Sequence, residues 1–189
     1  MTDVSRARAA SNSTVRSRAR RKPANPFAVG SVVVHPARGV FAVAATQTLR
    51  VDEQDVPALI LAAEGEGGSL AVPLARAAVT LRPLTTPAAM QEAFDVLRRP
   101  PRRSRAPWAR RAQDYAARIK SGDPMRIAEI LRDVHRGPQD GEQSWSERQV
   151  FERALDRFVA EFAAVERIGR AEALQRVMSA LDERAVIRR

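Results

Sequence analysis

Trp108 stands within the most basic stretch of the chain, residues 98–111, which reads RRPPRRSRAPWARR and has seven arginines and no acidic residue. A flat apolar ring can stack on nucleobases or wedge between them while guanidinium groups hold the neighbouring phosphates. The same ring can instead pack against its own helix, because an aromatic residue in a first helical turn often covers nearby apolar side chains. The residue types leave both roles open, nucleic-acid contact and core packing.

Positive charge is concentrated in two segments of the chain. The 189 residues have a formal net charge of +10, to which residues 1–26 contribute +6 and residues 98–111 contribute +7. The rest of the chain is mildly acidic, with a net charge of about −3. Nearly all the basic residues are arginines, whose planar guanidinium groups bind phosphates through paired hydrogen bonds. High-GC codon usage also enriches arginine, but it does not explain the clustering, so the charge pattern favours a nucleic-acid partner.

The sequence has none of the residue patterns that support catalysis or metal binding. It contains no cysteine, which excludes disulfides, thiolate zinc sites and cysteine nucleophiles. His35 and His135 are far apart in the sequence, and we interpret them as a strand-end residue and a residue at a helix C-terminus. No HExxH, GxSxG or Walker pattern occurs. We therefore expect no enzyme activity, no metal and no cofactor.

The N-terminal segment and the hydropathy of the chain bear on its location. Residues 1–26 are rich in Arg and Ser and poor in apolar residues, which predicts a disordered basic tail. This tail lacks the apolar core of a signal peptide. No apolar run approaches the roughly 18 residues that a membrane-spanning helix needs. We expect a cytoplasmic monomer that does not bind membranes.

Residues 27–84 have the pattern of a small β-domain. Apolar, partly β-branched runs at 29–34, 40–43, 58–61 and 69–74 alternate with turn-forming residues. Residues 49–55 predict a polar turn, residues 65–68 predict a hairpin, and residues 79–81 predict a short fifth strand. Several short strands separated by turns predict a small closed barrel.

Residues 85–189 change to a helical period. Thr86-Pro87 and Asp123-Pro124 predict helix starts, and Ser144 with Glu147 predicts a capping box. Trp145 follows this cap, next to an apolar stripe, which predicts a packing role. A last short helix is expected around residues 174–181. The predicted fold class is α+β, with a tail (1–26), a β-domain (27–84) and a helical domain (85–189).

Six short motifs follow one another along the chain. They read FAVGSVVVHPARG (27–39), LAVP (70–73), FDVLRRP (94–100), PWARR (107–111), KSGD (120–123) and AEILRD (128–133). The order and spacing of this series resemble those of the CarD/CdnL family of bacterial transcription regulators. The likeness covers residues 27–182, nearly everything except the tail.

The resemblance implies both a fold and a mechanism. It implies a Tudor-like β-domain that docks on the β subunit of RNA polymerase by pairing edge strands, followed by a compact helical domain. The helical domain would contact promoter DNA at the upstream edge of the transcription bubble, where Trp108 would wedge into the minor groove. Arg110 and Arg111 would grip the DNA backbone beside it. Further backbone contacts are expected from Arg102, Arg103 and Arg105. Such contacts would change the stability of the open complex without reading a sequence.

Some positions depart from the family pattern. His35 replaces the tyrosine before Pro36, and Gln113 stands where relatives often carry a lysine. The positions that match basic polymerase contacts of relatives are Leu49 and Ala71, and neither is basic. Together with Leu70 they are the candidate polymerase-binding residues, so docking would depend on backbone pairing and shape.

A second class of function stays open. The two basic segments also fit a polymerase-independent protein that binds DNA or RNA without sequence preference. Such a protein should bind nucleic acid tightly by itself, with a steep salt dependence. A polymerase-bound regulator should instead bind DNA weakly until polymerase tethers it nearby.

Overall fold

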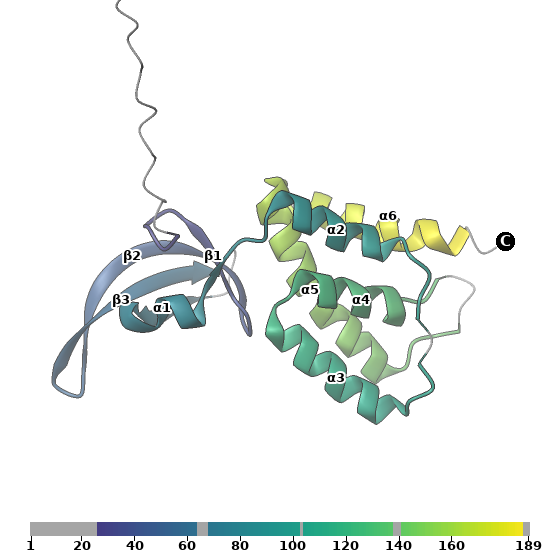
Figure 1. Cartoon of the computed structure of the whole chain (residues 1–189), viewed down its shortest axis with the longest axis horizontal. Helices are drawn as coiled ribbons and strands as arrows, with labels where there is room; N and C mark the ends of the chain where they lie inside the picture. The colour runs from purple at the N-terminus through teal and green to yellow at the C-terminus, as the bar shows by residue number, and fades with distance from the viewer. Residues whose placement is uncertain (1–25, 64–67, 103, 138–140, 187–189) are drawn as a thin grey trace, which may run out of the picture.

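The computed structural model describes residues 26–63, 68–102, 104–137 and 141–186, so most of the tail predicted for residues 1–26 lies outside the described residues. The chain begins with a five-stranded antiparallel sheet whose strand order is β4-β3-β2-β1-β5. The strands are β1 (Val32–His35), β2 (Gly39–Val51), β3 (Gln54–Ala63), β4 (Ser69–Pro73) and β5 (Arg82–Pro83). An α-helix, α1 (Leu74–Thr80), lies between β4 and β5 in the chain. Five helices follow, and the fold is therefore α+β (Figure 1).

The sheet differs from the sequence prediction in two ways. Its order is linear, with β4 and β5 at opposite edges, so the described strands do not close into the expected barrel. The predicted fifth strand at residues 79–81 is also wrong, because Val79 and Thr80 end α1 and the strand follows at Arg82–Pro83. The alanines of LARAAVT favour a helix, and Ala77 packs that helix against the sheet.

Strands β2 and β3 form a hairpin that is longer than the sequence suggests. The polar turn expected at residues 49–55 consists of only two residues, Asp52 and Glu53. Their φ values of 48° and 64° are left-handed. A two-residue turn with both central residues in this conformation matches the twist of the flanking strands, so pairing continues up to Val51 and Gln54. A bulge between Val43 and Ala45 shifts the register and changes which side chains face the core beyond it.

The helices begin and end largely where the sequence predicts. They are α2 (Pro87–Leu97), α3 (Trp108–Ser121), α4 (Pro124–Val134), α5 (Trp145–Glu166) and α6 (Arg170–Val186). The caps at Thr86, Asp123 and Ser144 are confirmed, since each side chain accepts a hydrogen bond from a backbone N–H of the first turn. The last helix is longer than predicted and has 17 residues. None of the described helices is long and apolar enough to cross a bilayer.

The buried apolar residues form two separate clusters. One lies between the sheet and α1 and includes Val33, Phe41, Leu59 and Leu61. The other joins α2 to α6 and contains a row of stacked rings, with centroids 4.9 Å apart for Phe94–Phe162 and 6.1 Å apart for Phe158–Phe162. Each cluster covers the apolar face of its own elements, so the sheet and the helices have distinct cores.

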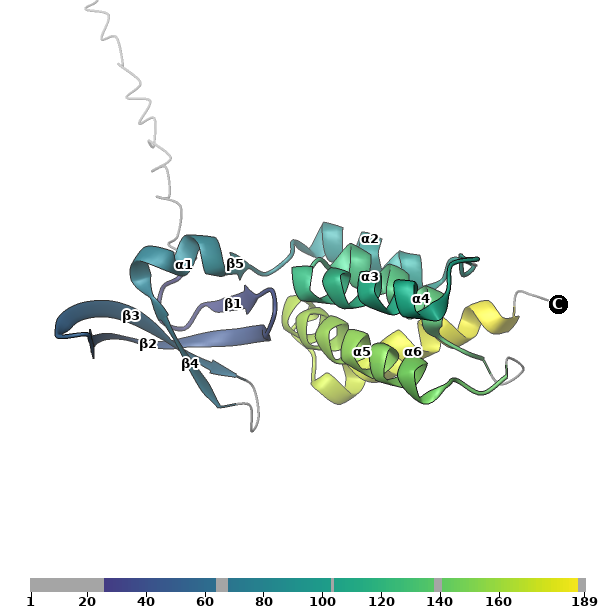
Figure 2. The ribbon, with the colours of Figure 1, turned by 90° about the horizontal axis from the view of Figure 1, so that it is seen from below.

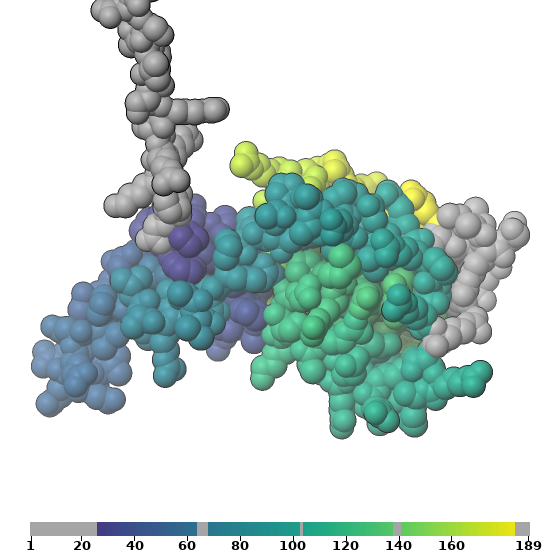
Figure 3. Space-filling view, viewed as in Figure 1, coloured from purple at the N-terminus to yellow at the C-terminus, as the bar shows by residue number. Residues whose placement is uncertain are grey.

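The sheet and the helices lie at opposite ends of the long axis of the molecule (Figures 1 and 2). In the space-filling view they touch in the middle of the molecule (Figure 3). Helices α3 and α5 both begin at the end that is farthest from the sheet and run towards it (Figures 1 and 2). The residues at the starts of these two helices are therefore held at a distance from the sheet.

Candidate nucleic-acid interface

The start of α3 presents the predicted aromatic and basic residues together. Trp108 is the first residue of the helix, and Arg110 and Arg111 follow in its first turn. The preceding Pro107 gives the helix no side-chain cap, and the first turn contains no acidic residue. The first backbone N–H groups and the positive end of the helix dipole therefore face outwards beside the arginines.

Trp108 combines the two roles that its sequence context left open. Its side chain is half-buried and packs against the helical core. The ring meets Tyr115 edge-on, with centroids 6.2 Å apart and an angle of 62° between the planes. The Arg111 guanidinium lies 5.0 Å from the centre of the Trp108 ring, in cation–π geometry. Trp108 is thus fixed in orientation by its neighbours while part of the ring stays open to a ligand.

The arginines of this region differ in availability. Arg102, Arg105 and Arg110 are exposed, and none of them forms an ion pair within the part of the chain that the structure describes. Arg111 is half-buried over Trp108, and its Nε has no hydrogen-bond partner among the described residues. Arg103 lies outside the described residues. Two exposed cations, Arg105 and Arg110, therefore lie within three residues of the start of α3, and Arg102 is exposed in the preceding loop.

Arg98, at the beginning of the basic stretch, is used within the fold instead. Its Nε lies 3.3 Å from a carboxylate oxygen of Glu183 on α6, and its guanidinium lies 5.1 Å from the centre of the Phe94 ring. The loop that follows is attached to α4, because the backbone N–H of Arg102 donates a 2.8 Å hydrogen bond to Asp133. These contacts hold the path of the chain between α2 and α3.

A buried ion pair fixes the helices to the sheet. Glu161 on α5 is 4% exposed, and the two terminal nitrogens of Arg82 on β5 donate hydrogen bonds of 2.6 and 2.7 Å to its two oxygens. Thr85 adds two more, from its hydroxyl at 2.7 Å and from its backbone N–H at 3.1 Å. The carboxylate is therefore fully paired, as a buried charge must be.

The same arginine also holds the C-terminal end of α3. Arg82 donates a 2.6 Å hydrogen bond to the carbonyl of Gly122, which ends the helix with a φ of 68°. A Cβ atom at Gly122 would lie 2.8 Å from Cα of Pro36, so only glycine lets the helix end approach the turn after β1 this closely. The far end of α3, which carries Trp108, is thereby placed relative to the sheet.

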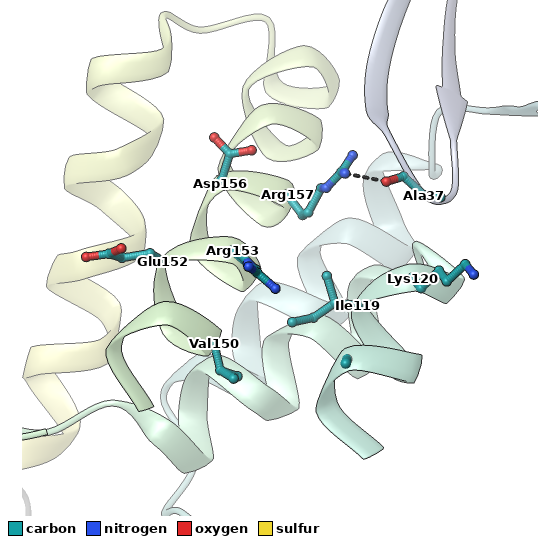
Figure 4. Close-up of a pocket in the computed structure, with 9 residues that line it drawn as sticks. Ala37, Ile119, Lys120, Val150, Glu152, Arg153, Asp156 and Arg157 are labelled. Atoms are coloured by element: carbon teal, nitrogen blue, oxygen red, sulfur yellow. Dashed lines mark hydrogen bonds between the residues drawn. The ribbon is translucent and has the colours of Figure 1, made fainter. Parts of the chain in front are cut away.

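Arg157 makes a second contact between the two parts of the molecule. It donates a hydrogen bond to the carbonyl of Ala37 (Figure 4). Burial lowers the pKa of its guanidinium, although the nearby Asp156 carboxylate raises it. A hollow of about 600 Å³ lies beside this contact, between α3, α5 and the turn after β1. Its charged lining includes Lys120 and Arg153 as well as Glu152 and Asp156, so it does not select a ligand of one charge sign.

The candidate polymerase-binding residues lie on both faces of the sheet. In the strand register, Ala71 is opposite Ile60, Ile60 is opposite Ala45, and Leu49 follows on the same face of β2. Leu49 and Ala71 therefore share the outer face, where Ala71 is exposed. Leu70 points to the other face and packs against the core of the sheet. The structure thus places two of the three candidates on one face of the sheet, although Leu49 lies four residues further along β2 than the level of Ala71.

The two histidines occupy the places that the sequence predicts. His35 ends β1, and its Nδ1 accepts a hydrogen bond from the backbone N–H of Ala37. His135 follows α4, is 8% exposed and lies 2.9 Å from a carboxylate oxygen of Asp182. Within the described residues, no group of three or more His, Cys, Asp or Glu side chains is arranged to hold a metal ion.

The packing role predicted for Trp145 is wrong, because its side chain is 77% exposed. Helical spacing explains the difference. The buried positions of α5 include Phe151, Ala154 and Phe158, and extending this face backwards leads to residues 144 and 147 rather than to Trp145. Trp145 instead shares its face with Arg148 and Gln149, and this polar spacing was the available signal.

The helical part matches a known family. Residues 92–178, from the middle of α2 into α6, match the family model described as CarD, C-terminal domain. The match contains the uncapped start of α3, the residues that join α3 to α4, and the whole of α5. The chain therefore contains a CarD C-terminal domain, and this match supports its resemblance to the CarD/CdnL family of transcription regulators.

Proposed function

We propose that this chain regulates transcription initiation, without catalysis, by binding the β subunit of RNA polymerase and promoter DNA at the same time. The start of α3 would contact DNA at the upstream edge of the transcription bubble. The observation that carries this proposal is the exposed Arg110 beside the oriented Trp108 ring, within the CarD C-terminal domain. Arginines that hold phosphates and an aromatic that wedges between bases are how proteins keep a distorted duplex open.

The sheet supplies the polymerase contact in this proposal. β4 is an edge strand, and its small residue Ala71, which is exposed, leaves room for another chain to approach. An open edge can add a strand from a partner through backbone hydrogen bonds. The protein would act as a cytoplasmic monomer, since one copy carries both contacts.

The DNA contact is expected to be weak in the absence of polymerase. Contacts to phosphates position a protein but do not read a sequence. Tethering to polymerase raises the effective concentration of the helices near DNA, so the combined complex is tighter than either contact alone. The Arg82–Glu161 pair supports this proposal, because it holds the sheet, which would contact polymerase, and the helices, which would contact DNA, in one arrangement.

The lifetime of the promoter open complex tests the DNA contact. Trp108→Ala should remove most of the effect that the wild-type protein has on this lifetime. Trp108→Leu retains apolar packing against Tyr115 but cannot stack on a base, and it should fail similarly. Thermal denaturation shows whether each variant is folded. A folded Trp108→Leu protein that acts like wild type would contradict the wedge.

Gel-shift titrations with and without polymerase separate the two classes of function. The proposal expects weak binding of promoter DNA by the protein alone and strong recruitment when polymerase is present. Tight binding without polymerase, unchanged when polymerase is added, would instead identify an independent nucleic-acid binder.

Binding to the isolated β-subunit lobe tests the sheet contact. Ala71→Glu introduces a charge on the exposed face of β4 and should weaken binding, because the charge would be desolvated at the interface. Ala88→Glu, an equal change at an exposed position of α2, is the matched control and should bind normally. Equal binding by both variants would place the polymerase contact elsewhere.

A further inference from the structure

Trp145 has a large apolar side chain on the outside of the molecule, and the backbone that carries it is fixed by hydrogen bonds. It is the first residue of α5 and is 77% exposed. The capping box beneath it is complete: Ser144 Oγ accepts from the Glu147 N–H at 3.3 Å, and Glu147 accepts from the Ser144 N–H at 3.1 Å. Arg136 pairs with Glu147 at 3.3 Å and ties the same turn to the end of α4. An exposed tryptophan on a fixed backbone is pre-oriented for a partner.

Trp145 lies at the same end of the helical bundle as the start of α3. Residues Ala116 and Val150 line one hollow together with Lys120 and Arg153, so α3 and α5 run side by side in the same direction. Ala112 lies one turn before Ala116 on α3, and residue 146 lies one turn before Val150 on α5. These two positions are therefore at the same height along the bundle. Both helices begin at the end of the bundle that is away from the sheet (Figures 1 and 2). Trp145 therefore occupies the same end as the Trp108 surface.

The charges around this end favour nucleic acid over an acidic or neutral partner. Arg148 lies one turn beyond Trp145 on the same face and is exposed. The exposed arginines of the α3 start lie on the neighbouring helix. Of the acidic groups, Glu147 is largely buried and paired with Arg136, while Glu142 and Glu152, which follows two turns after Trp145 on the same face, are exposed. The exposed cations outnumber the exposed acids among the described residues at this end.

We propose that Trp145 is a second DNA contact and stacks on an unpaired base of the strand that separates beside Trp108. This inference rests on the proposed DNA contact of α3. Neighbouring helices pack about 8–10 Å apart, which is about three steps of stacked bases along a strand. An exposed ring with an arginine one turn away has the composition of a single-strand stacking platform. Trp108 would hold the duplex edge, and Trp145 would hold the first melted nucleotides.

The chain offers a direct optical test, because it contains only two tryptophans. Trp108→Phe leaves Trp145 as the only indole, and Trp145→Phe leaves Trp108. Each full-length variant is titrated at low salt with forked DNA that has an unpaired tail, and with the blunt duplex. The titration is carried to concentrations at which a gel shift shows the forked DNA bound. Stacking on a base quenches indole fluorescence, so Trp145 emission should fall with forked DNA and much less with the blunt duplex.

Affinity for the forked DNA gives a second measurement. Trp145→Ala should weaken it about 5- to 150-fold, the range that stacking of one base contributes. Leu174→Ala, which removes another exposed apolar side chain on α6, is the control and should change nothing. Both substitutions are at exposed positions, so both proteins should fold.

The outcomes distinguish this inference from the function on which it rests. Quenching of Trp108 without quenching of Trp145 would overturn the inference and leave the proposed function standing. Quenching of neither, at concentrations at which the gel shift shows the forked DNA bound, would contradict both. If Trp145→Ala weakened binding to polymerase in the absence of DNA, Trp145 would belong to a protein interface and the inference would be wrong.

Discussion

Arg110 extends its charge into solvent, whereas Arg111, the next residue, lies over the Trp108 ring. The two arginines therefore have different tasks. In the proposed DNA contact, Arg110 would neutralise a phosphate, and Arg111 would support the face of the aromatic ring opposite to an incoming base. A lysine at position 111 would keep the charge but lose the planar group that covers the ring.

The salt dependence of DNA binding should report the role of Arg110. We predict that Arg110→Gln lowers the slope of log affinity against log salt concentration by about 0.9, the value for one lost phosphate contact. Arg170→Gln is the matched control, because Arg170 is exposed but already paired with Asp156. The two slopes are measured on one duplex in the presence of polymerase. An unchanged slope for Arg110→Gln would remove this residue from the contact.

His35 should make the folded state sensitive to mild acid. Its burial lowers the pKa of the imidazole, and its Nδ1 accepts a backbone hydrogen bond only when it is unprotonated. The unfolded chain therefore binds a proton more readily, so stability should fall as the pH drops below the ordinary histidine value of about 6.5. His35→Tyr should reduce this fall in denaturant unfolding at pH 7.5 and 5.5. An identical pH dependence in both proteins would contradict the prediction.

Some residues of the site can be predicted from the sequence, and others cannot. The position of Trp108 and its arginines follows from composition, because an acid-free run with one aromatic stands out in any sequence. The pairing of Arg82 with Glu161 does not, since the two residues are far apart in the chain and neither belongs to a pattern. Such a pair exists only when the sheet and the helices are placed against each other.

At the scale of elements, helices α3 and α5 begin in opposite ways. α5 closes its first N–H groups with its own capping box, whereas α3 begins after a proline and leaves its groups open. Sequence signals of this kind located nearly every helix, because prolines, caps and glycines act locally. Helix α1 was missed because its seven residues are too few to show a period, and its formation depends on packing against the sheet.

The capping box of α5 should contribute measurably to stability. We predict that Ser144→Ala lowers the free energy of unfolding by about 0.5–2 kcal/mol, the usual cost of losing an N-cap side chain. Ser179→Ala, in the middle of α6 and exposed, is the control and should be neutral or slightly stabilising. Urea unfolding of both variants measures the difference. Equal stability would mean that water replaces the cap without loss.

The pKa of Glu147 gives this cap a pH dependence of its own. Burial raises that pKa, but the Ser144 N–H and the Arg136 guanidinium outweigh burial and hold it below its usual value. The cap is therefore fully formed above the ordinary carboxyl range and is lost as the pH falls through the lowered value. The difference between wild type and Ser144→Ala should shrink under those acidic conditions.

At the scale of the whole molecule, the joint between sheet and helices depends on a few polar contacts. Arg82 bridges β5, the end of α3 and α5 through hydrogen bonds to Gly122 and Glu161. Arg157 adds its bond to Ala37. These contacts link two parts that have separate apolar cores, so single substitutions at the joint should be destabilising.

We predict that Arg82→Ala destabilises the protein by about 3–5 kcal/mol, because it leaves the buried Glu161 carboxylate without its partner. Arg98→Ala removes ion pairs that are exposed, and it should cost about 0–1 kcal/mol from charge alone. Thermal and denaturant unfolding rank the two variants. If Arg98→Ala were the more damaging change, the Arg82–Glu161 pair would not hold the joint.

The burial of Glu161 has a consequence for how the molecule responds to its surroundings. Mobile ions screen exposed charges within about 10 Å at ordinary ionic strength, but they reach a buried pair far less. The arginines at the start of α3 stand in the solvent, while the carboxylate at the joint is almost fully covered. As the salt concentration rises, the protein should release DNA long before its two ends swing apart. In the proposed complex, DNA binding would therefore weaken with salt while the arrangement of the sheet and the helices stays unchanged.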